Sequence, residues 1–91
     1  MDLDTRLTIP PHVLSRLVGE ETVLLDLESG VYFGLDGVGK FIWDSVSEGM
    51  SLAETVDAIV AEYEVDDAQA RADAVAFASA LIEKGLVQGR G

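Results

Sequence analysis

The apolar pattern of the chain changes its period at Asp36-Gly37, and this change constrains the fold more than any other feature. Before it, residues 22–27 and 31–35 are rich in strand-forming side chains, and an earlier strand is expected over residues 12–18. After it, apolar residues recur every three or four positions, as they do on one face of a helix. The sequence therefore predicts an α+β fold, in which a three-stranded antiparallel sheet is followed by a three-helix bundle similar to a winged helix.

Short turns connect the predicted strands. Gly19-Glu20-Glu21 separates the first two, and Glu28-Ser29-Gly30 joins the second and third. This three-residue connection suits a hairpin with a left-handed residue at Gly30. Pro10-Pro11 is expected to block any regular ladder before the first strand, because proline lacks the backbone N–H that a ladder needs. The strands should form a meander.

Three helices are expected after Gly37. The first should stop at Gly49, and the third at Gly85, with Leu86-Val87 packing back on the sheet. Ser51-Leu52-Ala53-Glu54 matches a capping box and should open the second helix, while Asp66 should cap the third, with Gln69 in the reciprocal position.

The predicted helical core consists of apolar residues at helical spacing. These are Val38, Phe41, Ile42 and Val46 in the first helix, with Trp43 and Ser45 off the stripe; Leu52, Val56, Ile59, Val60 and Tyr63 in the second; and Val75, Ala78, Leu81 and Ile82 in the third.

Size and charge narrow the functional classes. Ninety-one residues allow one domain, spanning 1–91. The 17 acidic and 6 basic residues give a net charge of −11, which opposes nucleic-acid binding because that depends on Lys and Arg. No apolar stretch is long enough to cross a membrane, and the acidic N-terminus is no signal peptide. With no cysteine in the chain, a cytoplasmic location is expected.

Few residues of the sequence are candidates for catalysis or for metal binding. His12 is the one histidine, and Ser15 nearby has neither a third group nor an oxyanion site to complete a nucleophilic triad. A second histidine, a cysteine and a calcium-type loop are missing from the sequence, so no metal site and no cofactor are expected. The chain is predicted to be a binding protein and not an enzyme.

The third predicted strand offers a free edge. Its residues, Val31, Tyr32, Phe33, Gly34 and Leu35, include no Lys or Pro that would discourage pairing with another strand. Gly34 would let a second backbone come close. In the alternative interpretation, Val31, Phe33 and Leu35 only fill the core and Gly34 relieves crowding. That alternative leaves Tyr32 and the bare edge unexplained, so we expect peptide capture here.

A face of the third predicted helix adjoins this edge. Asp73, Ala76, Phe77 and Ala80 lie beside its core stripe, and Phe77 among small alanines would line a shallow apolar groove with Asp73 as an acceptor on its rim. The alternative, in which Phe77 is ordinary core and the alanines only raise helix propensity, stays open.

The free energy needed for micromolar binding requires such a groove. About four strand hydrogen bonds supply roughly 2–6 kcal/mol, whereas micromolar affinity needs about 8 kcal/mol. A couple of apolar anchor side chains, worth roughly 1.5–3 kcal/mol each, would have to add to the backbone bonds. The expected ligand therefore has a sparse apolar motif.

An extended set of residues resembles the PqqD-like family over roughly residues 12–87. Its blocks are Val23-Leu24-Leu25-Asp26-Leu27, Gly30, Tyr32-Phe33-Gly34-Leu35-Asp36, Val38-Gly39, Ile42-Trp43, Gly49, Ala53-Glu54, Val56, Tyr63, Val65-Asp66, Asp73-Ala74, Ala76-Phe77, Leu81 and Gly85-Leu86. Members of this family recognise the leader segments of ribosomally made, post-translationally modified peptides. The block around Tyr32 is most similar to the stand-alone recognition protein of lasso-peptide pathways. One departure is Asp36, where many relatives have Asn.

The resemblance implies that a precursor's leader peptide adds as a strand beside residues 31–35, against the face formed by Asp73, Ala76, Phe77 and Ala80. It also implies two protein partners, a leader peptidase of the cysteine-protease type and a macrocyclase that acts afterwards. Two alternatives remain: a precursor carrier in the synthesis of the quinone cofactor PQQ or another modified peptide, and a winged-helix DNA-binding protein, which the charge opposes.

Overall fold

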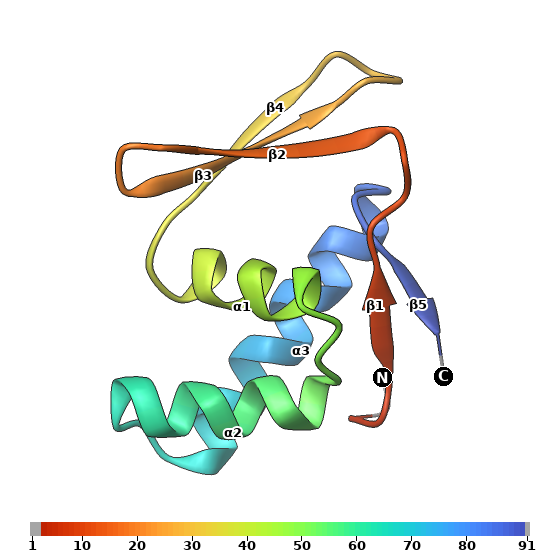
Figure 1. The fold of residues 1–91 in the computed structure, drawn as a ribbon. Coiled ribbons are helices and arrows are strands. Elements are labelled where there is room, and N and C mark those ends of the chain that lie inside the picture. Colours follow the sequence, from red (N-terminus) through yellow and green to blue (C-terminus); the bar gives the residue numbers. More distant parts are fainter. Residues whose placement is uncertain (1–2, 91) are drawn as a thin grey trace.

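The computed structural model describes residues 3–90, so Met1, Asp2 and Gly91 lie outside the described part of the chain. Figure 1 shows strands followed by helices, and the predicted α+β fold is confirmed. The elements are β1 (Arg6–Thr8), β2 (Val13–Val18), β3 (Glu21–Asp26), β4 (Tyr32–Leu35), α1 (Gly37–Ser47), α2 (Leu52–Tyr63), α3 (Asp67–Glu83) and β5 (Gln88–Arg90).

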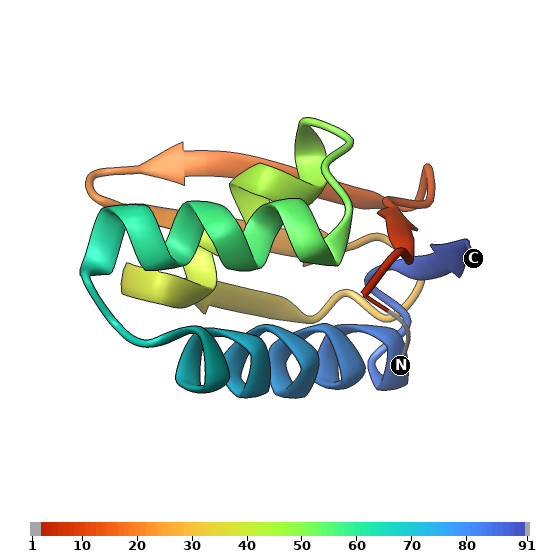
Figure 2. The same cartoon turned by 90° about the horizontal axis from the view of Figure 1, so that it is seen from below.

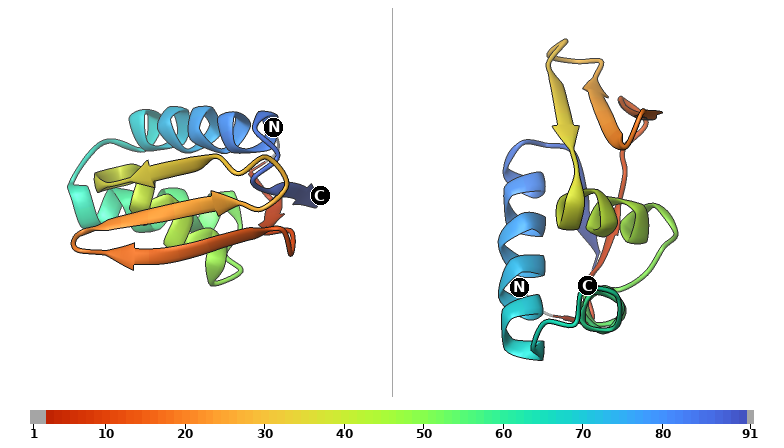
Figure 3. Two further views of the ribbon diagram at one scale, coloured as in Figure 1. Left: turned by 90° about the horizontal axis from the view of Figure 1, so that it is seen from above. Right: turned by 90° about the vertical axis from the view of Figure 1, so that its left-hand side faces the viewer.

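The sheet and the helices form stacked layers. β2, β3 and β4 make an antiparallel sheet in that order, with α1 directly beneath it and α2 farther below. α3 runs alongside β4, beyond the edge of the sheet, as the views from below and from above both show (Figures 2 and 3). Within residues 3–90, no helix has both the length and the apolar character needed to span a bilayer.

A second, two-stranded sheet joins the two ends of the described chain, and the sequence did not predict it. β1 pairs with β5 in antiparallel register, with Leu7 opposite Gly89. The expectation that Pro10-Pro11 blocks any ladder before the first strand of the meander is wrong, because β1 ends before the prolines and takes its partner from the other end of the chain. Leu86 and Val87 are buried in the core.

The burial of α1 differs from the prediction. Trp43 is 1% exposed and Ser45 is buried, although both were placed off the apolar stripe, while Val38 and Phe41 are only half-buried. The reason is that the sheet covers α1 from above and the other helices cover it from below. The Ser45 hydroxyl can be buried because it donates a hydrogen bond to the Phe41 carbonyl oxygen at 3.0 Å.

The core face of α3 also differs from the prediction. Ala78 and Leu81 are buried as expected, but Val75 is half-buried and Ile82 is 37% exposed. The remaining buried positions are small residues, Ala70 and Ala74. Small side chains allow a helix to approach its neighbours closely, so a prediction based on the large apolar residues missed part of the packed face. In α2, Val60 and Tyr63 are likewise less buried than predicted.

Both predicted N-caps are present, with one difference. The Ser51 hydroxyl accepts from the Glu54 amide at 3.2 Å, and the Glu54 carboxylate accepts from the Ser51 amide at 2.9 Å. Asp66 accepts from the Gln69 amide at 2.7 Å. The Gln69 side chain does not reach back to Asp66, however; it donates to Asp73 Oδ1 at 2.8 Å.

The β3–β4 turn is held by Asp26. Its Oδ1 accepts from the amides of Glu28 at 2.9 Å and Ser29 at 3.4 Å, and Gly30 has the predicted left-handed conformation with φ +74°. β4 begins at Tyr32, one residue later than predicted, so Val31 belongs to the turn. The hydrogen bond from the Glu28 amide is the main reason that the pKa of Asp26 lies below its usual value.

We predict that Asp26→Asn destabilises the protein in a pH-dependent manner. Because the folded pKa of Asp26 is depressed, the contribution of its carboxylate is complete above the unfolded pKa, near 3.8, and is lost as the pH falls through the folded value. Urea unfolding from pH 7 to pH 2.5 should show a constant stability difference between wild type and variant above about pH 5, shrinking towards acid. Asp57→Asn, an exposed change on α2, is the control. A pH-independent difference for Asp26→Asn would contradict this role.

Candidate functional site

One cluster of potential metal ligands occurs within residues 3–90, formed by His12, Asp26 and Glu28. His12 Nε2 lies 4.0 Å from Asp26 Oδ1, while Nδ1 lies 3.7 Å from Glu28 Oε2. The two carboxylates thus face different ring nitrogens, and one ion could bind only one of those nitrogens. Asp26 Oδ1 also accepts two backbone amides. The arrangement therefore connects the start of β2 to the β3–β4 turn.

The sheet has two free edges, β2 and β4, whereas the sequence analysis considered only the edge of the last strand. Residues of an antiparallel strand point their backbone groups alternately to one side and the other. The bond from the Asp26 amide to the Val31 carbonyl oxygen, together with the pairing of Leu24 with Phe33, directs the backbone of Phe33 towards β3. The N–H and C=O groups of Tyr32 and Gly34 consequently point to the free side of β4.

A groove runs between this edge and α3. Its first pocket, of about 330 Å³, is lined by Tyr32, Phe33, Gly34, Leu35, Phe77, Ala80, Leu81, Lys84 and Leu86. A second pocket, of about 410 Å³ between α1 and α3, is lined by Val38, Gly39, Ile42, Asp73, Ala76, Phe77 and Ala80. Because Phe77 and Ala80 line both, we treat the two pockets as one surface, the β4–α3 groove.

Phe77 forms the middle of the groove and rests on the backbone of α1. A Cβ atom at Gly39 would lie 3.2 Å from Phe77 Cε1, so any other residue there would press on the ring. Sequence reasoning did not select Gly39. A glycine in the first turn of a helix, where it costs roughly 1 kcal/mol relative to alanine, was the available sign of a close approach.

Eight of the nine predicted site residues line the groove. Tyr32, Phe33, Gly34 and Leu35 come from β4, and Asp73, Ala76, Phe77 and Ala80 come from α3. Val31 lines neither pocket and is 46% exposed in the turn. The residues that sequence reasoning missed include Lys84, which directly follows α3, and Leu86, which was expected to pack back on the sheet.

The groove carries one charge at each end. The Lys84 ammonium lies 5.4 Å from the centroid of the Phe33 ring, near the start of β4. Asp73 lines the opposite pocket, beside Val38 and Gly39, and its Oδ1 accepts from Gln69. Apolar side chains occupy the space between them.

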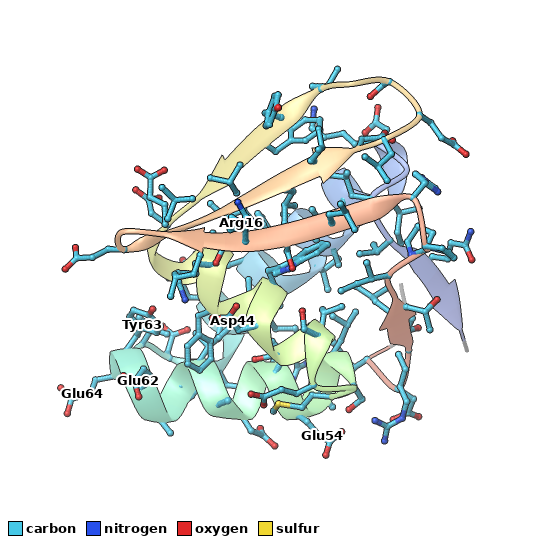
Figure 4. The ribbon with its side chains drawn as sticks, turned by 45° about the horizontal axis from the view of Figure 1, so that its top comes forward. Arg16, Asp44, Glu54, Glu62, Tyr63 and Glu64 are labelled. Atoms are coloured by element: carbon cyan, nitrogen blue, oxygen red, sulfur yellow. The ribbon has the colours of Figure 1, made fainter. Side chains whose placement is uncertain are left out.

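The β2 edge is different in character. It borders a pocket of about 340 Å³ lined by Ser15, Arg16, Leu17, Thr22, Lys40, Trp43, Asp44 and Ser47. Lys40 Nζ pairs with Asp44 Oδ2 at 2.8 Å inside it, and Figure 4 shows Asp44 beneath β2. Since backbone bonds alone supply too little free energy for micromolar binding, a pocket in which an ion pair and hydroxyl groups accompany Leu17 and Trp43 makes this edge the weaker candidate.

The face of the sheet turned away from the helices is apolar and uncovered. Its exposed side chains include Leu14 at 51%, Val18 at 55% and Tyr32 at 68%. With Val23, Leu25 and Arg16 they line a depression of about 510 Å³, which we call the outer face. A contiguous exposed apolar surface of this kind is typical of a protein-binding site.

Comparison with known proteins identifies relatives. The family model for coenzyme PQQ synthesis protein D (PqqD) matches residues 21–87. A solved structure described as TbiB1 in complex with the TbiA(beta) leader peptide is 44% identical, with a TM-score of 0.87, covering 92% of this chain and 98% of that one. A second, described as lasso peptide synthetase B1 complexed with the leader peptide, is 29% identical, with a TM-score of 0.82, covering 93% and 98%. No curated protein matches the chain.

Proposed function

Because the chain belongs to the PqqD family, we propose that it binds the leader segment of a ribosomally made precursor peptide in a lasso-peptide pathway. The observation that carries the proposal is the β4–α3 groove, where a free strand edge adjoins an apolar surface. The two similar solved structures are both described as complexes with leader peptides, which supports this ligand class.

The leader would add as a fourth strand beside β4. Its backbone would exchange hydrogen bonds with the outward N–H and C=O groups of Tyr32 and Gly34. Alternate leader side chains would then point towards the helices, where Phe77, Ala80 and Leu81 offer apolar contacts. Two anchors at roughly 1.5–3 kcal/mol each, added to roughly 2–6 kcal/mol from the backbone, bring micromolar affinity within reach.

The role is binding and not catalysis. The two similar solved structures are described as complexes with leader peptides, and the histidine of this chain faces the carboxylates of the β3–β4 turn instead of the groove. The groove itself is lined by aliphatic and aromatic side chains with one carboxylate and one ammonium group at its ends. Such a surface can hold a peptide in a defined register and present it to another protein.

That other protein would be a leader peptidase of the cysteine-protease type, and the outer face would receive it. The outer face lies on the sheet to which the leader adds, so a peptidase there would be adjacent to its substrate. A macrocyclase would act afterwards on the released core peptide. Since the precursor is made on ribosomes, we assign delivery to the cytoplasm.

A second candidate is a precursor carrier in PQQ synthesis, because the matching family model is described by that role. The same groove would then hold a different precursor. The 44% identity to the leader-bound TbiB1 structure favours a leader peptide as the ligand, and the similarity to the structure described as lasso peptide synthetase B1 favours the lasso pathway. Binding of the two precursor classes, measured side by side, would separate the candidates.

We predict that Ala80→Arg weakens binding of the TbiA(beta) leader peptide by at least about tenfold, because a long charged side chain would fill the middle of the groove. Ala72→Arg is the matched control, since Ala72 is exposed on the same helix and lines neither pocket. Fluorescence anisotropy with a labelled peptide gives both affinities. Phe77→Leu, which keeps an apolar core side chain, should weaken binding as well. Absence of saturable binding to wild type, or equal affinities for all four proteins, would refute the proposal.

We predict that Leu14→Glu slows peptidase cleavage of the precursor at least about fivefold without changing leader affinity. A carboxylate in the middle of the outer face would be desolvated by a docked partner, at a cost of at least about 1 kcal/mol. Leu17→Glu is the comparison, because the side chain of Leu17 points to the opposite side of β2. Cleavage rates and co-elution with the peptidase would be measured. An unchanged rate for Leu14→Glu would exclude the outer face as the docking surface.

A further inference from the structure

We propose that the β4–α3 groove selects its leader by charge as well as by apolar anchors, taking a basic side chain beside Asp73 and an acidic side chain beside Lys84. This inference rests on the proposed function and specifies the peptides that the groove accepts.

Cations in this chain are few, and three of the five Lys and Arg side chains that the structure describes are paired. The sequence has 6 Lys and Arg residues against 17 Asp and Glu. Among the side chains that the structure describes, Arg6 pairs with Glu54, Lys40 with Asp44 and Arg71 with Asp67. Arg16 and Lys84 have no carboxylate partner within residues 3–90. In a molecule with this excess of carboxylates, two unpaired cations require an explanation. Arg16 borders the outer face, and Lys84 borders the groove.

Lys84 is held at the place where a bound strand would pass. Its ammonium lies above the Phe33 ring, and Phe33 points from the β4 edge towards α3. Lys84 is also the C-cap residue of α3, where the helix dipole favours a cation. The dipole and the aromatic ring explain why a cation is stable there. They leave all of its hydrogen-bond donors available to a carboxylate of the ligand.

Asp73 makes the other end of the groove negative. Its Oδ1 accepts from Gln69 Nε2 at 2.8 Å, and no Lys or Arg pairs with it within residues 3–90. A neutral hydrogen bond orients a carboxylate without neutralising it, so Asp73 can still attract a cation. Because Gln69 does not complete the capping box, its side chain is free to fix Asp73 in this position.

The spacing of the two charges sets the length of the motif. Eleven helical positions separate Asp73 from Lys84, which at about 1.5 Å per residue is roughly 16 Å. A strand covers that distance in about five residues. The selected leader should therefore carry its basic and acidic residues four to six positions apart.

The order of the charges follows from strand direction. β4 runs from the Lys84 end of the groove, at Phe33, towards the Asp73 end, where the chain continues into Gly39. An antiparallel leader, the more stable pairing, would enter at Asp73 and leave at Lys84. Its basic residue should precede its acidic residue in the sequence.

A charge-exchange scan tests the proposal. Each polar residue of the TbiA(beta) leader peptide would be replaced in turn by Glu, Gln and Lys, and affinities measured for wild type and Lys84→Glu. At one position wild type should prefer Glu over Lys by about three- to tenfold, as expected of partly exposed ion pairs. Lys84→Glu should reverse that preference at the same position only. At a position four to six residues earlier, wild type should prefer Lys over Glu, and Asp73→Lys should reverse that preference.

Arg71→Glu is the matched control, because it changes the net charge equally, lies on the same helix and lines neither pocket. If Lys84→Glu, like Arg71→Glu, shifts the affinities of all peptides uniformly, Lys84 acts only through net charge and the inference is wrong. A reversal with the acidic position first would overturn the proposed direction. Loss of all binding by wild type would instead refute leader recognition itself, so the two failures are distinguishable.

Discussion

The close packing of α3 through its alanines determines where a ligand can bind. Ala70, Ala74 and Ala78 are completely buried, and this face seats α3 against the other helices. Figure 3 shows α3 alongside β4. With the alanine face packed, the adjoining face of α3, which carries Phe77, lines the groove beside the free edge of β4. Larger side chains on the packed face would move the helix outwards and widen the groove. The contact of Phe77 with Gly39 sets the depth of the groove in the same way.

A free edge alone does not make a binding site, and the comparison of β2 with β4 explains why. Both strands end the sheet and both present unpaired backbone groups. Pairing would give each edge similar backbone hydrogen bonds, so the difference lies in what the ligand side chains meet. Beside β2 they meet the Lys40–Asp44 ion pair, and beside β4 they meet apolar side chains. Affinity therefore depends on the helix next to the edge more than on the edge itself.

The sequence predictions were correct where the interactions join residues close in the chain, and they failed where the interactions join distant residues. Gly30 and the Ser51 cap depend on residues within a few positions, and both were predicted correctly. Trp43 was misplaced because a single-helix stripe cannot show that a helix is covered on two sides. The β1–β5 pair joins opposite ends of the chain, which no local pattern reveals. Eight groove residues were found because the edge strand and Phe77 are visible without knowing the packing.

Tyr32 links the two surfaces that recognition and delivery would use. Its backbone faces the free edge, where a leader strand would pair, while its side chain lies 68% exposed on the outer face. A strand added beside β4 must alternate its own side chains between the groove and the outer face. A bound leader would thus enlarge the outer face with its outward residues, next to Tyr32. A partner docking there would contact recognition protein and leader together, and could distinguish the loaded from the empty state without any change in the fold.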